Sequence, residues 1–516
     1  MKNKKATFIN IIAALISFGV QVIISFWLSP FVVGRLGEEA YGFINLANNF
    51  VSYASLVSVA INSMSSRYIS VEYNSGNKES AKSYFCSVFV ANCFLYGIIL
   101  FAAIIVIWRL EYVVNISPSL IVQVKLTFLI SFINMGASLI GTVYTAAAFT
   151  TGKMHYNSIV QIISNILKSI LIFALYSILP AKVYYLSLAT LAAGIVTFVG
   201  NFKVTKKLFA DFNIEKKYFD FEKLKTLLKS GSWVLISNVS NLLLNGLDLL
   251  FSNWFISSVI MGRLSLAKQI PLAMSNALGV FSNIFSSSLT KTFATDGNEK
   301  LVREAKSQLK ILAMLFTVPY AGIIIYGYNF LSLWLNDTNY NEFQLEEVYI
   351  LMILVLLDII VSTYMYSIHS IFIAIDKVKV YSIVLFISSI VSIVTTLTLV
   401  RYTNLGVYAI AGTSTVVLGF IHGVIVPACA AKLLDQPIWA FWKTELRSWG
   451  SLAVLCIAFY ALKNLLNFQN WLNFFVSILI AGLLGYILEF ILIFDKQARR
   501  QAVMIVKSKL IKRREY

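Results

Sequence analysis

The sequence is poor in charged residues and in cysteine. Only 13% of its 516 residues are Asp, Glu, Lys or Arg, whereas soluble globular proteins have about 25%. A water-soluble enzyme is therefore excluded. The four cysteines lie inside apolar runs without metal-ligand spacing, so we expect small buried side chains there and no metal site.

Motifs for covalent chemistry are also missing. The Gly152-Lys153 pair lacks the preceding glycine and the following hydroxyl residue of a nucleotide-binding P-loop. The three histidines, His155, His369 and His422, are scattered along the chain. We therefore expect transport rather than catalysis, with no resident cofactor and no ATP-driven step.

Apolar residues, by contrast, make up 58% of the chain. A membrane-spanning helix needs about 20 mostly apolar residues, so the sequence predicts an all-α polytopic membrane protein. The apolar runs predict fourteen spans, at about residues 8–33, 41–66, 84–108, 122–150, 156–179, 183–202, 231–257, 264–290, 311–335, 348–375, 380–400, 405–431, 448–466 and 471–494.

The net charge of +18 is distributed unevenly between the two sides of the predicted membrane. Most Lys and Arg residues lie in loops on the side of the N-terminus. The loops on the other side contain only Arg35, Arg109, Lys182, Arg263, Arg401 and Lys463. Because basic loops stay in the cytoplasm, both termini are expected there, where the charge would meet anionic lipid rather than nucleic acid.

Two short sequences recur in the second half of the chain. Val33-Gly34-Arg35-Leu36 matches Met261-Gly262-Arg263-Leu264, and Ser158-Ile159-Val160 matches Ser382-Ile383-Val384. An offset of six helices predicts a parallel repeat of two six-helix lobes, followed by two C-terminal helices. The expected parts are an N-lobe with a basic linker (1–229), a C-lobe (230–446), two helices (447–495) and a basic cytoplasmic tail (496–516).

Polar side chains form stripes on the first two helices of each repeat and on the fifth span. In lipid such stripes must face protein or water. Hydrogen bonds between helices would explain any single residue, but stripes on equivalent helices predict a cavity between the halves. The candidate cavity residues are Gln21, Asn45, Asn48, Asn165, Asn241, Asn245 and Asn276.

Charged residues within spans cost about 2.5–3.5 kcal/mol each and need a partner or a task. Lys168 shares a helical face with Asn165. Asp248 and Lys268 lie in adjacent spans, where a neutralising pair and a role in transport are both open. Asp358 is a further candidate for proton or cation binding, or a satisfied core position. Three more candidate cations lie near span ends, where they could also extend to the interface: Arg35, Arg67 and Arg263.

The opening segment Pro30-Phe-Val-Val-Gly34-Arg35-Leu36-Gly37, followed by Tyr41-Gly42, and the six-plus-six-plus-two pattern support a resemblance. The chain resembles the polysaccharide transporters (Wzx-type O-antigen, teichoic-acid and capsule flippases) of the multidrug/oligosaccharidyl-lipid/polysaccharide (MOP) exporter superfamily. The resemblance implies a V-shaped pair of lobes that alternates between inward-open and outward-open states. It would move an undecaprenyl-diphosphate-linked oligosaccharide from the inner to the outer leaflet of the bacterial cytoplasmic membrane.

A diphosphate headgroup requires cations together with amide or hydroxyl donors, which the candidate residues could supply. Its export is favoured by an interior-negative potential, by about 2.3 kcal/mol per charge per 100 mV. Proton or sodium coupling at Asp248 or Asp358 stays open. Polysaccharide polymerases and glycosyltransferases are expected partners of a monomeric transporter.

Three alternatives remain at this point. A multidrug/cation antiporter of the same superfamily should have an acidic cavity, because its substrates are mainly cations. A peptidoglycan-precursor lipid flippase would also bind a diphosphate. A polytopic scaffold would use the polar stripes for packing alone.

Overall fold

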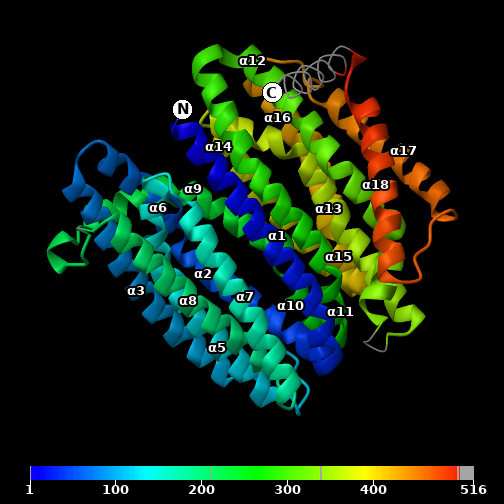
Figure 1. Ribbon diagram of the computed structural model, residues 1–516, viewed down its shortest axis with the longest axis horizontal. Helices are drawn as coiled ribbons and strands as arrows, with labels where there is room; N and C mark the ends of the chain where they lie inside the picture. The colour runs from blue at the N-terminus through cyan, green and yellow to red at the C-terminus, as the bar shows by residue number, and fades with distance from the viewer. Residues whose placement is uncertain (1, 211, 337–339, 497–498, 500–516) are drawn as a thin grey trace, which may run out of the picture. The chain divides into compact units, whose positions relative to one another are not determined.

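The computed structural model describes residues 2–210, 212–336, 340–496 and 499, and within these ranges the chain forms helices and no strand (Figure 1). In this part of the chain twelve helices are long and apolar enough to cross a membrane, and a bent pair, Glu342–Tyr364 with Tyr366–Ala374, makes a thirteenth. The predicted all-α polytopic fold is confirmed, and the predicted count of fourteen is approximate.

The chain divides into two compact units. Unit 1 comprises residues 1–269 and 385–410, and unit 2 comprises residues 270–384 and 411–516. The lobe boundaries expected from the repeat remain a prediction. The expected basic tail, 496–516, lies almost entirely outside the described residues.

The helices of unit 1 are α1 (Lys2–Leu36), α2 (Glu38–Asn74), α3 (Lys78–Trp108), α4 (Leu110–Val113), α5 (Ile121–Gly141), η1 (Thr142–Thr145), α6 (Ala146–Thr150), α7 (His155–Ile178), α8 (Tyr184–Leu208), η2 (Lys216–Tyr218), α9 (Phe221–Asn245), α10 (Asp248–Phe255) and α11 (Ser258–Ala267). Those of unit 2 are α12 (Gln269–Trp334), α13 (Glu342–Ala374), η4 (Ile421–Ile425), α16 (Val426–Leu433), α17 (Trp442–Lys463) and α18 (Trp471–Ile493). Besides α12, whose first residue belongs to unit 1, two helices contribute residues to both units, α14 (Val378–Tyr402) and α15 (Val407–Phe420).

In unit 1, α2 is crossed very closely by α9 and α11. A Cβ atom on Gly231 of α9 would lie 1.9 Å from the carbonyl oxygen of Ala60. A Cβ atom on Gly262 of α11 would lie 2.1 Å from the carbonyl oxygen of Glu38. Small residues allow membrane helices to approach in this way, so glycine at these two positions permits the crossings around α2.

The linker between α8 and α9 contributes aromatic side chains to the core of unit 1. Phe209 and Phe212 are both buried. The ring of Phe209 stacks on Tyr73 of α2, with centroids 4.6 Å apart. Because the linker can bury its rings in the core of unit 1, these two side chains pack against protein instead of lipid.

Unit 2 contains three irregular helices. The backbone of α12 leaves helical geometry at Gly297, whose φ is 77°. The bend between the two segments of α13 is 45°. Residues Ile421–Ile425 (η4) form one turn of π-helix between α15 and α16. In Figure 1, α17 and α18 run side by side along this unit. Broken and π-helical turns leave backbone groups available, which is common at functional sites in membrane proteins.

Asp495, just beyond α18, forms ion pairs with residues of two other helices of unit 2. Its carboxylate lies 2.6 Å from Nη1 of Arg447 on α17 and 2.9 Å from Nζ of Lys310 on α12. The hydrogen bonds from Arg447 and then Lys310 lower the pKa of Asp495 to about 2. A carboxyl with a lowered pKa stabilises the fold above its ordinary pKa near 4, and this contribution is lost as the pH falls through about 2.

We therefore expect Asp495→Asn to flatten the loss of thermal stability between about pH 4 and pH 2, by a small amount because the side chain is exposed. Thermal unfolding of the purified protein in detergent measures this. Asp435→Asn, at an exposed aspartate after α16, is the control. Equal pH dependence of Asp495→Asn and the unchanged protein would contradict the prediction.

Candidate functional site

The span from Phe221 to Phe255 is interrupted inside unit 1. Helix α9 ends at Asn245, the N–H of Gly246 donates to the carbonyl oxygen of Leu242 at 2.7 Å, and α10 begins at Asp248. A helix end leaves unpaired backbone groups, which within a membrane must find partners in the protein. The break therefore creates a polar point inside an apolar span.

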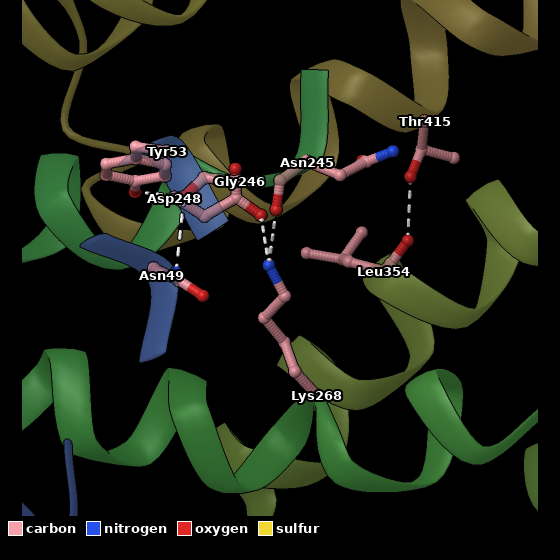
Figure 2. A network of polar contacts seen from close by, with 8 residues as sticks. All are labelled: Asn49, Tyr53, Asn245, Gly246, Asp248, Lys268, Leu354 and Thr415. Atoms are coloured by element: carbon pink, nitrogen blue, oxygen red, sulfur yellow. Dashed lines mark hydrogen bonds and ion pairs between the residues drawn. The ribbon is translucent and has the colours of Figure 1, made fainter. Parts of the chain in front are cut away.

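Lys268, between α11 and α12, fills this break (Figure 2). Its Nζ donates to Oδ2 of Asp248 at 2.8 Å and to the carbonyl oxygen of Asn245 at 2.9 Å, and both charged side chains are buried. A cation at the C-terminus of α9 and an anion at the N-terminus of α10 also complement the helix dipoles. Of the two roles left open by the sequence, the structure contains the neutralising pair.

Helix α2 also donates hydrogen bonds to the backbone at the break between α9 and α10. The carbonyl oxygen of Gly246 accepts a hydrogen bond from Nδ2 of Asn49 at 3.2 Å and one from the hydroxyl of Tyr53 at 2.5 Å (Figure 2). One turn before Asn49, Nδ2 of Asn45 donates to Oγ of Ser265 at 2.6 Å. The sequence analysis did not predict a role for Asn49 and Tyr53. Their spacing of four residues, starting from Asn45, places all three side chains on one face of α2 and could have indicated it.

Arg263 is also paired. Its Nε lies 2.9 Å from Oε2 of Glu38 in a largely buried ion pair. The neighbouring Glu39 accepts hydrogen bonds from the hydroxyls of Ser117 at 2.8 Å and Ser258 at 2.9 Å. The sequence reasoning missed both glutamates, which directly follow Gly37. The charge of Arg263 is therefore neutralised within unit 1, and its side chain does not extend freely to the interface.

Lys168 behaves differently from the paired cations. It is half-buried on α7, and no ion-pair partner for it occurs among the residues that the structure describes. On the same helix, Nδ2 of Asn165 and Oδ1 of Asn157 are buried without a hydrogen-bond partner in that part of the chain. This face of α7 therefore has unused hydrogen-bonding capacity beside a cation.

The other predicted residues are dispersed. Arg35 is exposed and donates from Nη1 to the carbonyl oxygen of Tyr176 at 3.0 Å. Asp358 is buried on α13, in unit 2. The remaining candidates are exposed on their helices: Gln21 on α1, Asn48 and Arg67 on α2, Asn241 and Asn245 on α9, and Asn276 on α12. Of the predicted set, the structure brings Asp248, Lys268 and Asn245 into direct contact.

Similarity to known proteins agrees with the fold. The family described as "Polysaccharide biosynthesis protein" matches residues 4–285, more than half of the chain. The uncharacterized membrane protein EpsK of Bacillus subtilis (strain 168) is 23% identical over 492 residues, which cover 95% of this chain and 96% of EpsK.

Two solved structures share the fold at low sequence identity. An inward-facing multidrug resistance MATE family transporter of the MOP superfamily has a TM-score of 0.68 at 14% identity, covering 83% of this chain and 95% of that one. The lipid II flippase MurJ, in an inward closed conformation, has a TM-score of 0.65 at 18% identity, covering 93% and 97%. The resemblance expected from the sequence is thus confirmed: the chain belongs to the polysaccharide biosynthesis protein family and has the fold of the MOP superfamily.

Proposed function

We propose that this protein is a flippase that moves an undecaprenyl-diphosphate-linked oligosaccharide, the repeat unit of a cell-surface polysaccharide, from the inner to the outer leaflet by alternating access. The proposal places it in the bacterial cytoplasmic membrane with both termini in the cytoplasm, as the distribution of Lys and Arg predicts. Glycosyltransferases and a polymerase would supply and consume its substrate.

Lys168 is the observation on which the proposal depends most. A cation within a membrane span is costly unless it has a partner or a task, and no ion-pair partner lies within the described ranges. The unpaired amide groups of Asn165 and Asn157 lie on the same helix. A diphosphate with attached sugars offers the anionic oxygens and hydroxyls that such a face would bind.

The acidic residues in or next to the spans of unit 1 support an anionic substrate. Asp248 is neutralised by Lys268, Glu38 is paired with Arg263, and Glu39 accepts two hydroxyl hydrogen bonds. These three carboxylates therefore have partners, while Lys168 has no ion-pair partner among the described residues. A negatively charged substrate would neutralise the charge of Lys168, whereas a cationic drug would be repelled by it.

The proposal predicts that Lys168→Gln slows translocation by about tenfold or more, whereas Lys168→Arg retains most of it. A hydrogen bond to a charged group is worth about 1.5–3 kcal/mol, and 1.4 kcal/mol corresponds to a factor of ten. The assay reconstitutes the protein in liposomes with a fluorescent undecaprenyl-diphosphate sugar and follows its arrival in the outer leaflet with a membrane-impermeant quencher.

Lys153→Gln, at an exposed lysine just before α7, is the matched control and should transport normally. Equal rates for Lys168→Gln and Lys153→Gln would remove Lys168 from the binding site. Uptake of cationic dyes with no movement of the lipid-linked sugar would instead favour the antiporter. The buried carboxylates of unit 2 are the observation that supports this alternative. Movement of lipid II alone would favour the peptidoglycan-precursor flippase.

A further inference from the structure

Helix α18 carries one carboxylate on its packed face. Its buried residues recur every fourth position, as Ser477, Ala481, Gly485, Glu489 and Ile493. Glu489 is 0% exposed in the span Trp471–Ile493. A Cβ atom on Gly485, one turn earlier, would lie 2.7 Å from Cζ of Phe459. Helix α17 therefore packs closely against α18 at the level of this carboxylate, so lipid and water are excluded.

Among the described residues, the carboxyl group of Glu489 accepts one hydrogen bond and has a second neutral hydroxyl beside it. Its Oε1 accepts a hydrogen bond from Oγ of Ser451 on α17 at 2.9 Å. Its Oε2 is buried and has no hydrogen-bond partner among the described residues. Thr317 and Tyr364 lie beside it, but their hydroxyls bond to each other at 2.9 Å. A single neutral donor does not compensate the desolvation of an ionised carboxylate.

Two basic residues near this end of α18, Arg447 and Lys310, bind groups other than Glu489. Arg447 of α17 donates from Nε to the carbonyl oxygen of Leu492 at 2.7 Å, and its Nη1 binds Asp495. Lys310 of α12 also binds Asp495. No ion-pair partner of Glu489 occurs among the described residues, and the titratable side chain that interacts with it is Tyr364 on α13. A tyrosine hydroxyl is neutral at physiological pH, so Glu489 has no counter-ion in this part of the chain.

A second buried carboxylate lies on the same helix as Ser451. The buried polar face of α17 comprises Thr444, Glu445, Ser448 and Ser451. Oε1 of Glu445 would lie 3.5 Å from a Cβ atom on Gly423 in the π-helical turn, where both ring nitrogens of His422 are buried without a partner in the described chain. Buried titratable side chains thus occur at both ends of one polar face within unit 2.

We propose that Glu489 is a proton-binding site, protonated in this conformation, and that it releases its proton when the contact between α17 and α18 opens to water. Burial without a cation favours the neutral acid, and hydration of the interface would remove that preference. The inference deepens the proposed function, because it names the proton as the coupling ion of the flippase. Proton binding itself does not depend on which substrate is moved.

The first experiment is an infrared difference titration of the full-length protein in lipid, which reports the carbonyl stretch of buried, protonated carboxylic acids. We expect one such band at neutral pH that Glu489→Gln removes and that Glu346→Gln, at an exposed glutamate on α13, leaves unchanged. Because glutamine is a neutral isostere, Glu489→Gln should keep the melting temperature of the unchanged protein. A folded Glu489→Gln variant with the same bands as the unchanged protein would overturn the proposal.

The second experiment measures coupling in liposomes with an imposed pH gradient. The unchanged protein and Glu346→Gln should move the labelled undecaprenyl-diphosphate sugar at rates that depend on the gradient. Glu489→Gln should transport at one rate whatever the gradient, and retained gradient dependence would disprove the coupling role. If no protein variant moved the lipid-linked sugar, the proposed function would fail, whereas the infrared result would still decide whether Glu489 binds a proton.

Discussion

Asp248→Ala is expected to lower the free energy of unfolding by about 3–5 kcal/mol, because it leaves the ammonium group of Lys268 buried without its anion. Lys268→Ala should have a comparable effect, since it also removes the donor to the carbonyl oxygen at the end of α9. Thermal or denaturant unfolding of the purified protein in detergent, followed by loss of helical circular dichroism, measures both variants.

The double variant Asp248→Leu with Lys268→Met should be more stable than either alanine variant, because it removes both charges and replaces them with apolar groups. Glu222→Ala is the matched control. Glu222 and Lys225 form an exposed pair at 3.7 Å in the first turn of α9, and such pairs contribute about 1 kcal/mol or less. If Asp248→Ala cost no more than Glu222→Ala, the pair would not hold the break between α9 and α10 together.

Composition and hydropathy were sufficient to predict the fold class. Apolar runs of about 20 residues have few other interpretations, and the family resemblance rested on a segment, Pro30 to Gly42, that lies at the α1–α2 junction. The count of fourteen spans was approximate, and hydropathy gave no sign of the interruption within one of them. Hydropathy treats 231–257 as one apolar stretch, because a single glycine in such a run hardly changes its average. The break at Gly246 therefore became visible only with its hydrogen bonds.

The partners of the candidate residues could not be predicted, because they come from distant parts of the chain. Lys268 and Asp248 are 20 residues apart, but Tyr53 and Gly246 are 193 apart and Arg263 and Glu38 are 225 apart. A charge count finds a cation in a span without showing whether an acid faces it. The sequence offered Asp248 as a possible partner of Lys268 and no acid for Lys168, but it could not decide between a pair and a role in transport; of these two lysines, Lys268 alone has an ion pair within the described residues.

The repeated Gly-Arg-Leu segment shows how equivalent residues can acquire different roles. In the second copy, Gly262 permits the close crossing with α2, and Arg263 binds Glu38. In the first copy, Gly34 is exposed, and Arg35 binds the carbonyl oxygen of Tyr176. The repeated segment therefore marks corresponding positions in the sequence, but the packing of each copy decides what its residues do.

Gly262→Ala is expected to destabilise the protein by about 1–3 kcal/mol, although it adds a single methyl group. The new Cβ atom would meet the backbone at Glu38, which cannot move aside as a flexible side chain could. Gly97→Ala, on α3 of the same unit, adds the same methyl group where nothing lies within 4 Å. That variant should be neutral or more stable by up to about 1 kcal/mol, since alanine restricts the unfolded chain and favours helix. Melting temperatures of the two variants in one detergent compare them directly. Equal melting temperatures would mean that α2 and α11 leave room for a methyl group at position 262. A lower melting temperature for Gly262→Ala alone would show that the glycine of the repeated segment is needed for this close crossing.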